Sequence, residues 1–261
     1  MKLHRIIAII WRHYFEAIHN LDKLVDMFYW PILDIIVWGF LSIYLFHNTQ
    51  TSAIVGFLLG AAILWGAFYS LQRDLSGGFL DELWSRNLVN LFSTPISIWE
   101  YLIGLVSVNF IKMIVGFIVA SLFAWAFYAF NIFPFSFSLL PFFLNLIFFA
   151  LAMGIFTTAL ILRYSTKIQT LAWSFAGVFQ PISCVFYPLS TLPAWLQLPA
   201  WFLPTTHAFE GMRQVLQFGT FSSLHFWWGL CLDFIYLFLS VIFFKYIFDV
   251  AKMKGILVKM E

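Results

Sequence analysis

The sequence predicts an all-α membrane protein with several membrane-spanning helices. Of its 261 residues, 62% are hydrophobic and only 10% are charged, whereas soluble domains carry about 25% charged residues. Apolar runs of about 20 residues, the length that crosses a hydrocarbon core of ~30 Å, recur along the whole chain. The near balance of 14 basic and 12 acidic residues gives no sign of a nucleic-acid partner.

Residues 1–26 have the pattern of an amphipathic helix that lies at the membrane surface. Apolar residues recur every three or four positions, and polar residues occupy the opposite face. The charged residues interrupt the segment, so it lacks the continuous hydrophobic region of a cleavable signal peptide, and we expect it to remain on the protein. The apolar positions are Leu3, Ile6, Ile7, Ile10, Tyr14, Ile18 and Leu21, opposed by Arg5, Arg12, Glu16 and Asn20.

Residues 27–250 contain six apolar stretches that can each span the bilayer, and they form one transmembrane domain. The third stretch is longer than one crossing needs, so its first turns are expected to lie in the interface. The predicted spans are residues 27–46, 53–71, 98–130, 139–162, 168–188 and 224–248.

The basic residues predict the orientation of these spans. Most of the 14 Lys and Arg residues precede the first span, lie in alternate connections or close the chain. Because basic residues concentrate in cytoplasmic loops, both termini are expected to be cytoplasmic. Residues 251–261 would then form a basic cytoplasmic tail.

The connection after the second predicted span has its own helical pattern at about residues 76–93. Gly77 and Gly78 precede this helix and Pro95 follows it, so we expect a short, separate amphipathic element. Such an element suits docking into another protein's groove, although a helix lying on lipid headgroups has the same pattern. The candidate docking residues are Phe79, Leu80, Leu83, Trp84, Arg86 and Leu88.

The connection between the fifth and sixth predicted spans is apolar, yet it holds five of the nine prolines. A straight helix does not tolerate that density of proline, whereas broken helices that dip into the membrane do. We expect a re-entrant hairpin at about residues 189–220 that forms an outer gate, with an ordinary outer loop as the alternative. The spacing of Glu210 and Arg213 predicts an ion pair. The candidate gate residues are Pro188, Pro193, Pro204, His207, Glu210 and Arg213.

Three ionisable residues, Asp34, Lys112 and Asp233, fall inside predicted spans. Each costs about 2.5–3.5 kcal/mol at a helix centre, so each is expected to face protein or water. Asp34 and Lys112 have similar predicted depths, which allows an ion pair between them. Alternatively, Lys112 extends to the membrane surface and Asp34 bonds to backbone or hydroxyl groups.

Several segments together resemble the membrane (permease) subunit of an ABC transporter of the type-2 exporter class, and the resemblance covers essentially the whole chain. They are the helix that ends in Ser93-Thr94-Pro95, the proline-rich loop of residues 186–197, and the run from Leu203 to Arg213. The chain departs from the family in having Asp74 and two glycines where members often have Glu and one Gly. The resemblance implies outward movement of drugs, lipids or lipid-linked glycans by alternating access. It also implies a bacterial inner-membrane location, contact with membrane lipids and a second permease copy, expected to be identical.

The chain lacks the motif that would let it bind ATP itself. None of its 14 glycines is followed by Lys-Ser or Lys-Thr, so it has no P-loop. The resemblance therefore implies that a separate ABC ATPase subunit uses ATP and docks on the predicted helix at residues 76–93, while this chain binds no cofactor. Motifs of metalloproteases and serine hydrolases are also missing, so we expect no enzyme activity. The alternative is a polytopic membrane transferase acting on lipid-linked substrates, which would need a cluster of carboxylates in one polar loop.

Overall fold

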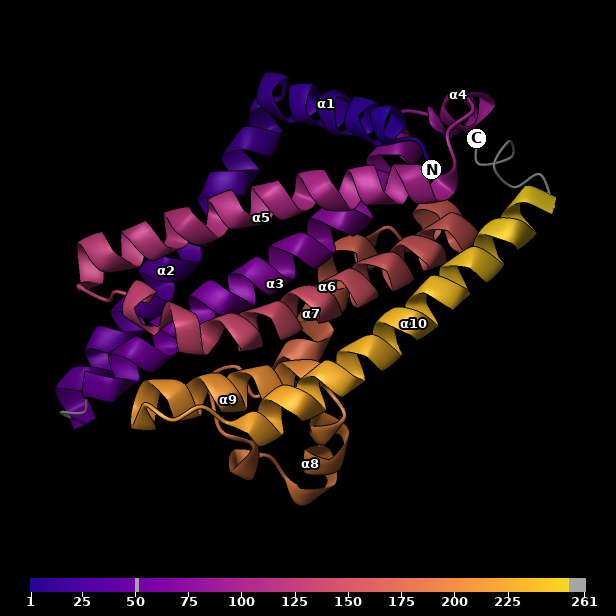
Figure 1. Cartoon of the computed structure of the whole chain (residues 1–261). Coiled ribbons are helices and arrows are strands. Elements are labelled where there is room, and N and C mark those ends of the chain that lie inside the picture. Colours follow the sequence, from indigo (N-terminus) through magenta and orange to yellow (C-terminus); the bar gives the residue numbers. More distant parts are fainter. Residues whose placement is uncertain (50–51, 254–261) are drawn as a thin grey trace.

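The computed structural model describes residues 1–49 and 52–253, which form ten α-helices, four short 3-10 turns and their connections (Figure 1). No strand occurs in these residues, which confirms the predicted all-α class. The helices are α1 Leu3–His19, α2 Leu21–Thr49, α3 Ser52–Trp84, α4 Leu88–Ser93, α5 Ile98–Tyr128, α6 Ser136–Tyr164, α7 Thr170–Phe179, α8 Ala194–Trp201, α9 Pro204–Phe218 and α10 Ser223–Met253. The 3-10 turns are Phe133–Phe135, Ser165–Ile168, Gln180–Ile182 and Leu189–Thr191.

Five of these helices, α2, α3, α5, α6 and α10, are long and apolar enough to cross a membrane. They correspond to the first four predicted spans and the last one, and most of them extend beyond the predicted limits. A polytopic helical membrane domain is therefore confirmed.

The predicted fifth span, residues 168–188, is not a continuous helix in the structure. Its longest helical part is α7, whose 10 residues give a length of about 15 Å, half of the hydrocarbon thickness. Pro181 cannot donate a backbone hydrogen bond, and a 3-10 turn at Gln180–Ile182 follows α7. Cys184 then adopts the left-handed region with φ 53°, so the chain leaves the helical path.

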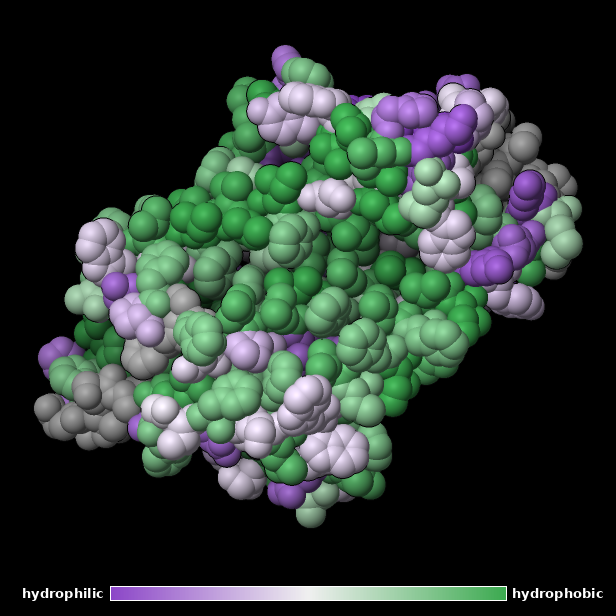
Figure 2. Space-filling model, in the orientation of Figure 1, coloured by the Kyte–Doolittle hydropathy of each residue, from purple (hydrophilic) through white to green (hydrophobic). Residues whose placement is uncertain are grey.

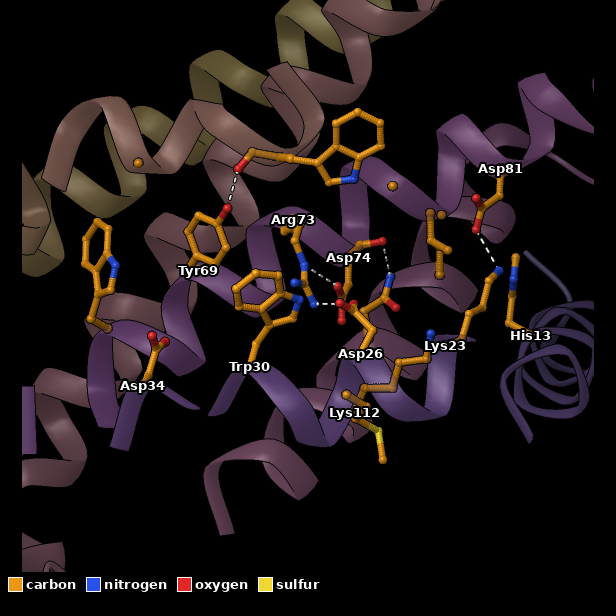
Figure 3. A pocket seen from close by; sticks show the side chains of 18 of the residues that line it. His13, Lys23, Asp26, Trp30, Asp34, Tyr69, Arg73, Asp74, Asp81 and Lys112 are labelled. Atoms are coloured by element: carbon orange, nitrogen blue, oxygen red, sulfur yellow. Dashed lines mark hydrogen bonds and ion pairs between the residues drawn. The ribbon is translucent and has the colours of Figure 1, made fainter. Parts of the chain in front are cut away.

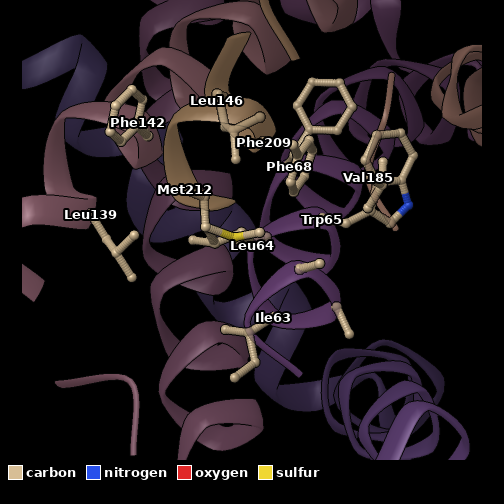
Figure 4. Packing of buried hydrophobic residues seen from close by; sticks show 14 of the residues in the cluster. Ile63, Leu64, Trp65, Phe68, Leu139, Phe142, Leu146, Val185, Phe209 and Met212 are labelled. Carbon is tan, nitrogen blue, oxygen red and sulfur yellow. The ribbon is translucent and has the colours of Figure 1, made fainter. Parts of the chain in front are cut away.

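The central helix of the bundle is α3, which packs against α2, α5, α6, α7 and α9, while α6 packs along α10. Figure 4 shows the mid-length core, where buried side chains of α3, α6 and α9 meet. A Cβ atom at Gly211 would lie 2.1 Å from a ring carbon of Phe142, so α9 approaches α6 more closely than any larger residue allows. The core includes Leu64, Phe68, Phe142, Phe209 and Met212.

The expected separate helix at residues 76–93 is wrong in its boundaries. Helix α3 continues through Gly77 and Gly78 to Trp84, and α4 is a separate short helix. Glycine inside a helix costs about 1 kcal/mol relative to alanine. Here a Cβ at Gly78 would lie 2.7 Å from the buried Leu105 side chain of α5, so the glycine permits close helix packing rather than a break.

The predicted N-terminal amphipathic helix is shorter than residues 1–26, because α1 ends at His19 and α2 begins at Leu21. Buried Ile9 and His13 face the protein. The outward face exposes large apolar side chains, as expected of a helix at the membrane surface. These exposed residues are Leu3, Ile7, Trp11, Tyr14, Phe15 and Ile18.

Within the predicted outer hairpin at residues 189–220, α8 and α9 form two arms of different character. Helix α9 is buried over most of its length, whereas α8 exposes Trp195 and Leu198. The prolines mark where regular structure begins: Pro188 and Pro193 precede helical turns, and Pro204 is the first residue of α9. Proline suits these positions because the first turn of a helix has no partner for its N–H groups.

The surface is apolar over the middle of the bundle, and hydrophilic residues gather near α1 and α4 (Figure 2). The start of α1, helix α4 and the last turns of α10 all lie at this same end, which we call the α1 end (Figure 1). Most of the predicted basic tail, residues 254–261, lies outside the described residues.

Candidate functional site

A cavity of about 640 Å³ lies between α2, α3, α5 and α7, beside α1 (Figure 3). Its lining residues come from several helices and include both charged and aromatic side chains. A smaller pocket of about 50 Å³ lies between α2, α3 and α5 and shares Asp26, Asp34, Arg73 and Lys112 with the larger cavity. Asp34 and Lys112, two of the three ionisable residues predicted inside spans, line both pockets.

Ion pairs join α1, α2 and α3 at one end of the cavity. Lys23 Nζ lies 2.6 Å from Glu16 Oε1 and 2.7 Å from Asp81 Oδ2. Glu16 also pairs with His13, at 3.3 Å from Nδ1. The hydrogen bond from His13, together with that from Lys23, lowers the pKa of Glu16 to about 2.

A second cluster of charges centres on Arg73 of α3. Its guanidinium lies 2.9 Å from Asp26 Oδ2 of α2 and 3.0 Å from Asp74 Oδ1 (Figure 3). Asn109 of α5 donates a hydrogen bond of 3.1 Å to the backbone carbonyl of Asp74. The ion pairs offset charges that would otherwise be costly within spanning helices, and the contacts together tie α3 to α2 and α5.

Tyr69 and five tryptophans, one of which is Trp84, form the aromatic part of the cavity lining. Tyr69 donates a hydrogen bond of 2.6 Å to the backbone carbonyl of Trp173, which links α3 to α7. Trp38 stacks on Phe186, with ring centroids 3.6 Å apart, and so links α2 to the segment after α7. The other four tryptophans are Trp30, Trp38, Trp65 and Trp173.

Asp34 and Lys112 both line the cavity, but the ion pair that the sequence allowed between them is not formed. A Cβ at Gly116 would lie 3.6 Å from the ring of Pro31 and 3.9 Å from the carbonyl oxygen of Met27. Lys112 precedes Gly116 by one turn, toward the α1 end, whereas Asp34 follows Pro31 toward the opposite end. Helices α2 and α5 are therefore offset along their axes, and this offset separates Asp34 from Lys112, which the sequence placed at similar membrane depths.

Asp233 of α10 lies elsewhere, buried to 1% exposure and outside the lining of both pockets. Neither of its carboxyl oxygens has a hydrogen-bond partner within the described part of the chain. The structure thus separates the three predicted intramembrane residues into two that face a cavity and one enclosed between helices.

Most of the candidate docking residues point into the protein, which corrects their predicted exposure. Phe79, Leu80, Leu83 and Leu88 are buried in a second core with Ile9 of α1 and Tyr101 of α5. Glu82, on the polar side of this segment, also faces α1, because it is buried and pairs with Arg12. Trp84 and Arg86 are the two candidates that remain exposed.

The expected ion pair between Glu210 and Arg213 is formed, with Oε1 and Nη1 2.7 Å apart. Each partner makes further bonds to the segment that precedes α8. Arg213 Nη2 donates to the carbonyls of Cys184, at 3.0 Å, and Tyr187, at 2.9 Å. Glu210 Oε1 accepts a hydrogen bond of 2.6 Å from the backbone N–H of Leu189. The pair therefore fastens α9 to residues 184–189.

His207 lies one turn before Glu210 but contacts different groups. Its Nε2 atom lies 2.8 Å from the carbonyl of Trp201, and its Nδ1 atom lies 3.1 Å from Nδ1 of His225 in α10. These contacts connect α8, α9 and α10. Among the residues that the structure describes, no group of three or more His, Cys, Asp or Glu side chains is arranged to hold a metal ion.

Sequence reasoning identified Asp34 and Lys112 but missed the ion-pair clusters around Lys23 and Arg73. The sequence does contain a signal for these clusters, because charged residues lie just before the first predicted span and just after the second. Two consecutive spans run antiparallel, so such charges lie at the same membrane level and can pair. The partners are Glu16, Asp26, Asp74 and Asp81.

A helical membrane domain with an internal cavity of charged and aromatic side chains has the architecture of a membrane transporter. Residues 5–217 match the family model of the ABC-2 type transporter, so the match runs from α1 into α9. The chain belongs to this family and is an ABC-2 type permease subunit. Comparison with curated proteins gives no significant match.

Proposed function

We propose that the chain is the permease subunit of an ATP-driven exporter, which moves a hydrophobic or amphipathic substrate outward by alternating access. The observation that carries this proposal is the cavity within the membrane domain, with ion pairs at one end and aromatic side chains along its walls. Its volume of about 640 Å³ falls in the range of small-molecule sites. A drug, a lipid or the lipid part of a glycan carrier would satisfy such walls.

The proposed topology has six crossings, with both termini in the cytoplasm of a bacterial cell and the chain in its inner membrane. Besides the five long helices, a further crossing, the fifth in chain order, would combine α7 with the irregular residues that follow it, shielded by α9. The common location of α1 and the end of α10 supports an even number of crossings (Figure 1). The α8–α9 hairpin would dip back from the outer side as the gate.

The energy would come from a separate ABC ATPase subunit that binds at the α1 end. The buried residues of the predicted docking helix cannot reach it, so the docking surface moves to the turn between α3 and α4. Arg86 of this turn and Asn90 of the adjoining α4 are exposed there. A second, identical permease copy and membrane lipids are the other proposed partners.

The transferase alternative is less well supported by the site. It would need carboxylates that are free to bind a metal or activate a substrate. Four of the five carboxylates of the cavity are instead held by Lys23 and Arg73. Family membership also favours transport over group transfer.

Transport through the cavity can be tested by filling it from α7. Gly177 lines the cavity, and a Cβ atom added there would have no neighbouring atom within 4 Å, so Gly177→Trp inserts an indole into the path. Val178, the next residue, is 67% exposed and does not line the cavity, so Val178→Trp is the matched control. ATP-dependent uptake of a fluorescent amphipathic substrate into inverted vesicles should stop in Gly177→Trp and continue in Val178→Trp. Equal uptake in both variants would contradict this path.

A further inference from the structure

We propose that the cavity binds a hydrophobic organic cation, with Asp34 as the counter-ion of the bound positive charge. This inference rests on the proposed function, since it names the substrate class of the same cavity. It depends on three features: one unpaired carboxylate, aromatic rings around it and an acidic balance of charge.

The first feature is the unpaired carboxylate of Asp34. Glu16 and Asp81 are paired with Lys23, and Asp26 and Asp74 are paired with Arg73. No ion pair or hydrogen bond joins Asp34 to any residue that the structure describes. A carboxylate within a spanning helix requires a partner or water, and a ligand cation would supply the direct ion pair that Asp34 lacks among the described residues, where Arg73 attracts it only from a distance.

The second feature is the set of aromatic rings beside Asp34. Trp30 and Trp38 lie four residues before and after it on α2, so all three occupy one face of that helix. Tyr69 and Trp65 come from the facing helix α3, and Figure 3 shows Asp34 pointing toward Tyr69, with Trp30 nearby. Aromatic faces attract cations, most strongly where water is displaced.

The third feature is the balance of charges in the cavity lining. Five carboxylates face three Lys or Arg side chains and one histidine, so the cavity is acidic overall. Lys112, the basic residue without a described partner, lies nearer the α1 end than Asp34 does. A bound cation can therefore contact Asp34 while remaining apart from Lys112. A hydrophobic anion would meet the repulsion of the carboxylates.

The test compares two hydrophobic ions of matched size and opposite charge, tetraphenylphosphonium and tetraphenylborate. Binding to the full-length chain in lipid nanodiscs is measured by equilibrium dialysis, with empty nanodiscs as the blank for partitioning into lipid. The cation should bind about tenfold or more tightly than the anion. Asp34→Asn keeps the side-chain size and should weaken binding of the cation by about tenfold.

Two further variants control the result. Lys112→Met removes a charge from the same cavity and should leave cation binding unchanged or tighter. Asp249→Asn removes an exposed carboxylate of α10 outside the cavity and should have no effect. Thermal unfolding of each variant checks that the fold is retained.

The inference is overturned if Asp34→Asn binds the cation as the unchanged protein does, or if the anion binds equally tightly. Its failure can be told apart from failure of the exporter proposal. ATP-dependent uptake of another amphipathic substrate without cation binding would remove the cation site alone. Cation binding without any ATP-dependent transport, in a complex with intact ATPase activity, would instead remove the exporter proposal.

Discussion

At the scale of single residues, short-range pairing was predictable and long-range pairing was not. Glu210 and Arg213 lie three residues apart on one helix, so their spacing alone places them on one face, and the structure shows the pair. Asp34 and Lys112 belong to different helices. Their alignment depends on the offset of α2 against α5, which is set by packing and is not visible in the sequence.

The carbonyl contacts of Arg213 predict that exchanging the two charges will not rescue the fold. In the exchange of Glu210→Arg with Arg213→Glu, a carboxylate would face the carbonyls of Cys184 and Tyr187, which accept hydrogen bonds and cannot donate them. We expect Arg213→Gln to destabilise the protein by about 3 kcal/mol, as loss of one partner of a buried pair does, and the exchanged protein to be no better. Melting temperatures in detergent measure this. Recovery in the exchanged protein would show that the charge pair alone matters.

The ion pairs of Glu16 predict how the attachment of α1 responds to acid. A carboxyl group whose pKa falls to about 2 on folding stabilises the folded state above its unfolded pKa, near 4.5, and loses that contribution as the pH falls toward 2. Glu16→Gln removes the contribution. The difference in melting temperature between the two proteins should be present at pH 7 and pH 5, both of which lie above the unfolded pKa of Glu16. It should shrink by pH 3, and a difference independent of pH would contradict the assignment.

At the scale of helices, the apolar periodicity predicted where the long helices lie, whereas the expectation that two glycines interrupt a helix was wrong. Gly77 and Gly78 resemble a break in the sequence, but α3 passes through them because α5 packs against Gly78. The end of α3 is set further along, where Arg86 is left-handed with φ 53°. Its N–H bonds to the Leu83 carbonyl, and that of Asn87 bonds to the Glu82 carbonyl, which is the Schellman arrangement of a helix end.

Arg86 therefore offers a way to separate backbone effects from docking. Glycine adopts the left-handed region without steric cost, so Arg86→Gly should stabilise the fold by up to about 1 kcal/mol. Arg86→Glu keeps the backbone cost and reverses the exposed charge, so its melting temperature should stay close to that of the unchanged protein. If the turn binds the ATPase subunit, both variants should reduce co-purification with it. Normal co-purification of Arg86→Glu would place the docking surface elsewhere.

The close approach of α9 and α6 predicts opposite effects of two identical substitutions. Gly211→Ala would push the buried ring of Phe142 out of its position, at a cost of about 1–3 kcal/mol. Gly66→Ala of α3 adds a methyl group where no atom lies within 4 Å, so it should be neutral or stabilising by up to about 1 kcal/mol. Thermal unfolding compares them. A stable Gly211→Ala protein would show that the hairpin is packed less tightly than the structure indicates.

At the scale of the whole molecule, composition established the membrane class, and the structure shows how the two ends differ. The proposed topology is checked by labelling intact cells with an impermeant thiol reagent. Thr220, between α9 and α10, and Asn90 of α4 are both exposed. In a Cys231→Ala background, Thr220→Cys should react from outside and Asn90→Cys should not, until the membrane is permeabilised. The reverse pattern would invert the orientation.

The attachment of α1 has a mechanical consequence for the membrane around the protein. Arg12 and Glu82 fasten this helix to α3, while Trp11 and Phe15 project from its outer face. Any tilt of α3 that widens the cavity must therefore drag bulky rings through the headgroup layer, where lipid packing resists displacement. The surrounding lipid would therefore resist this movement in addition to the protein's own contacts. If α1 lies in the cytoplasmic leaflet, as the proposed topology has it, lateral pressure there would contribute to the energy difference between the proposed open and closed states of the cavity.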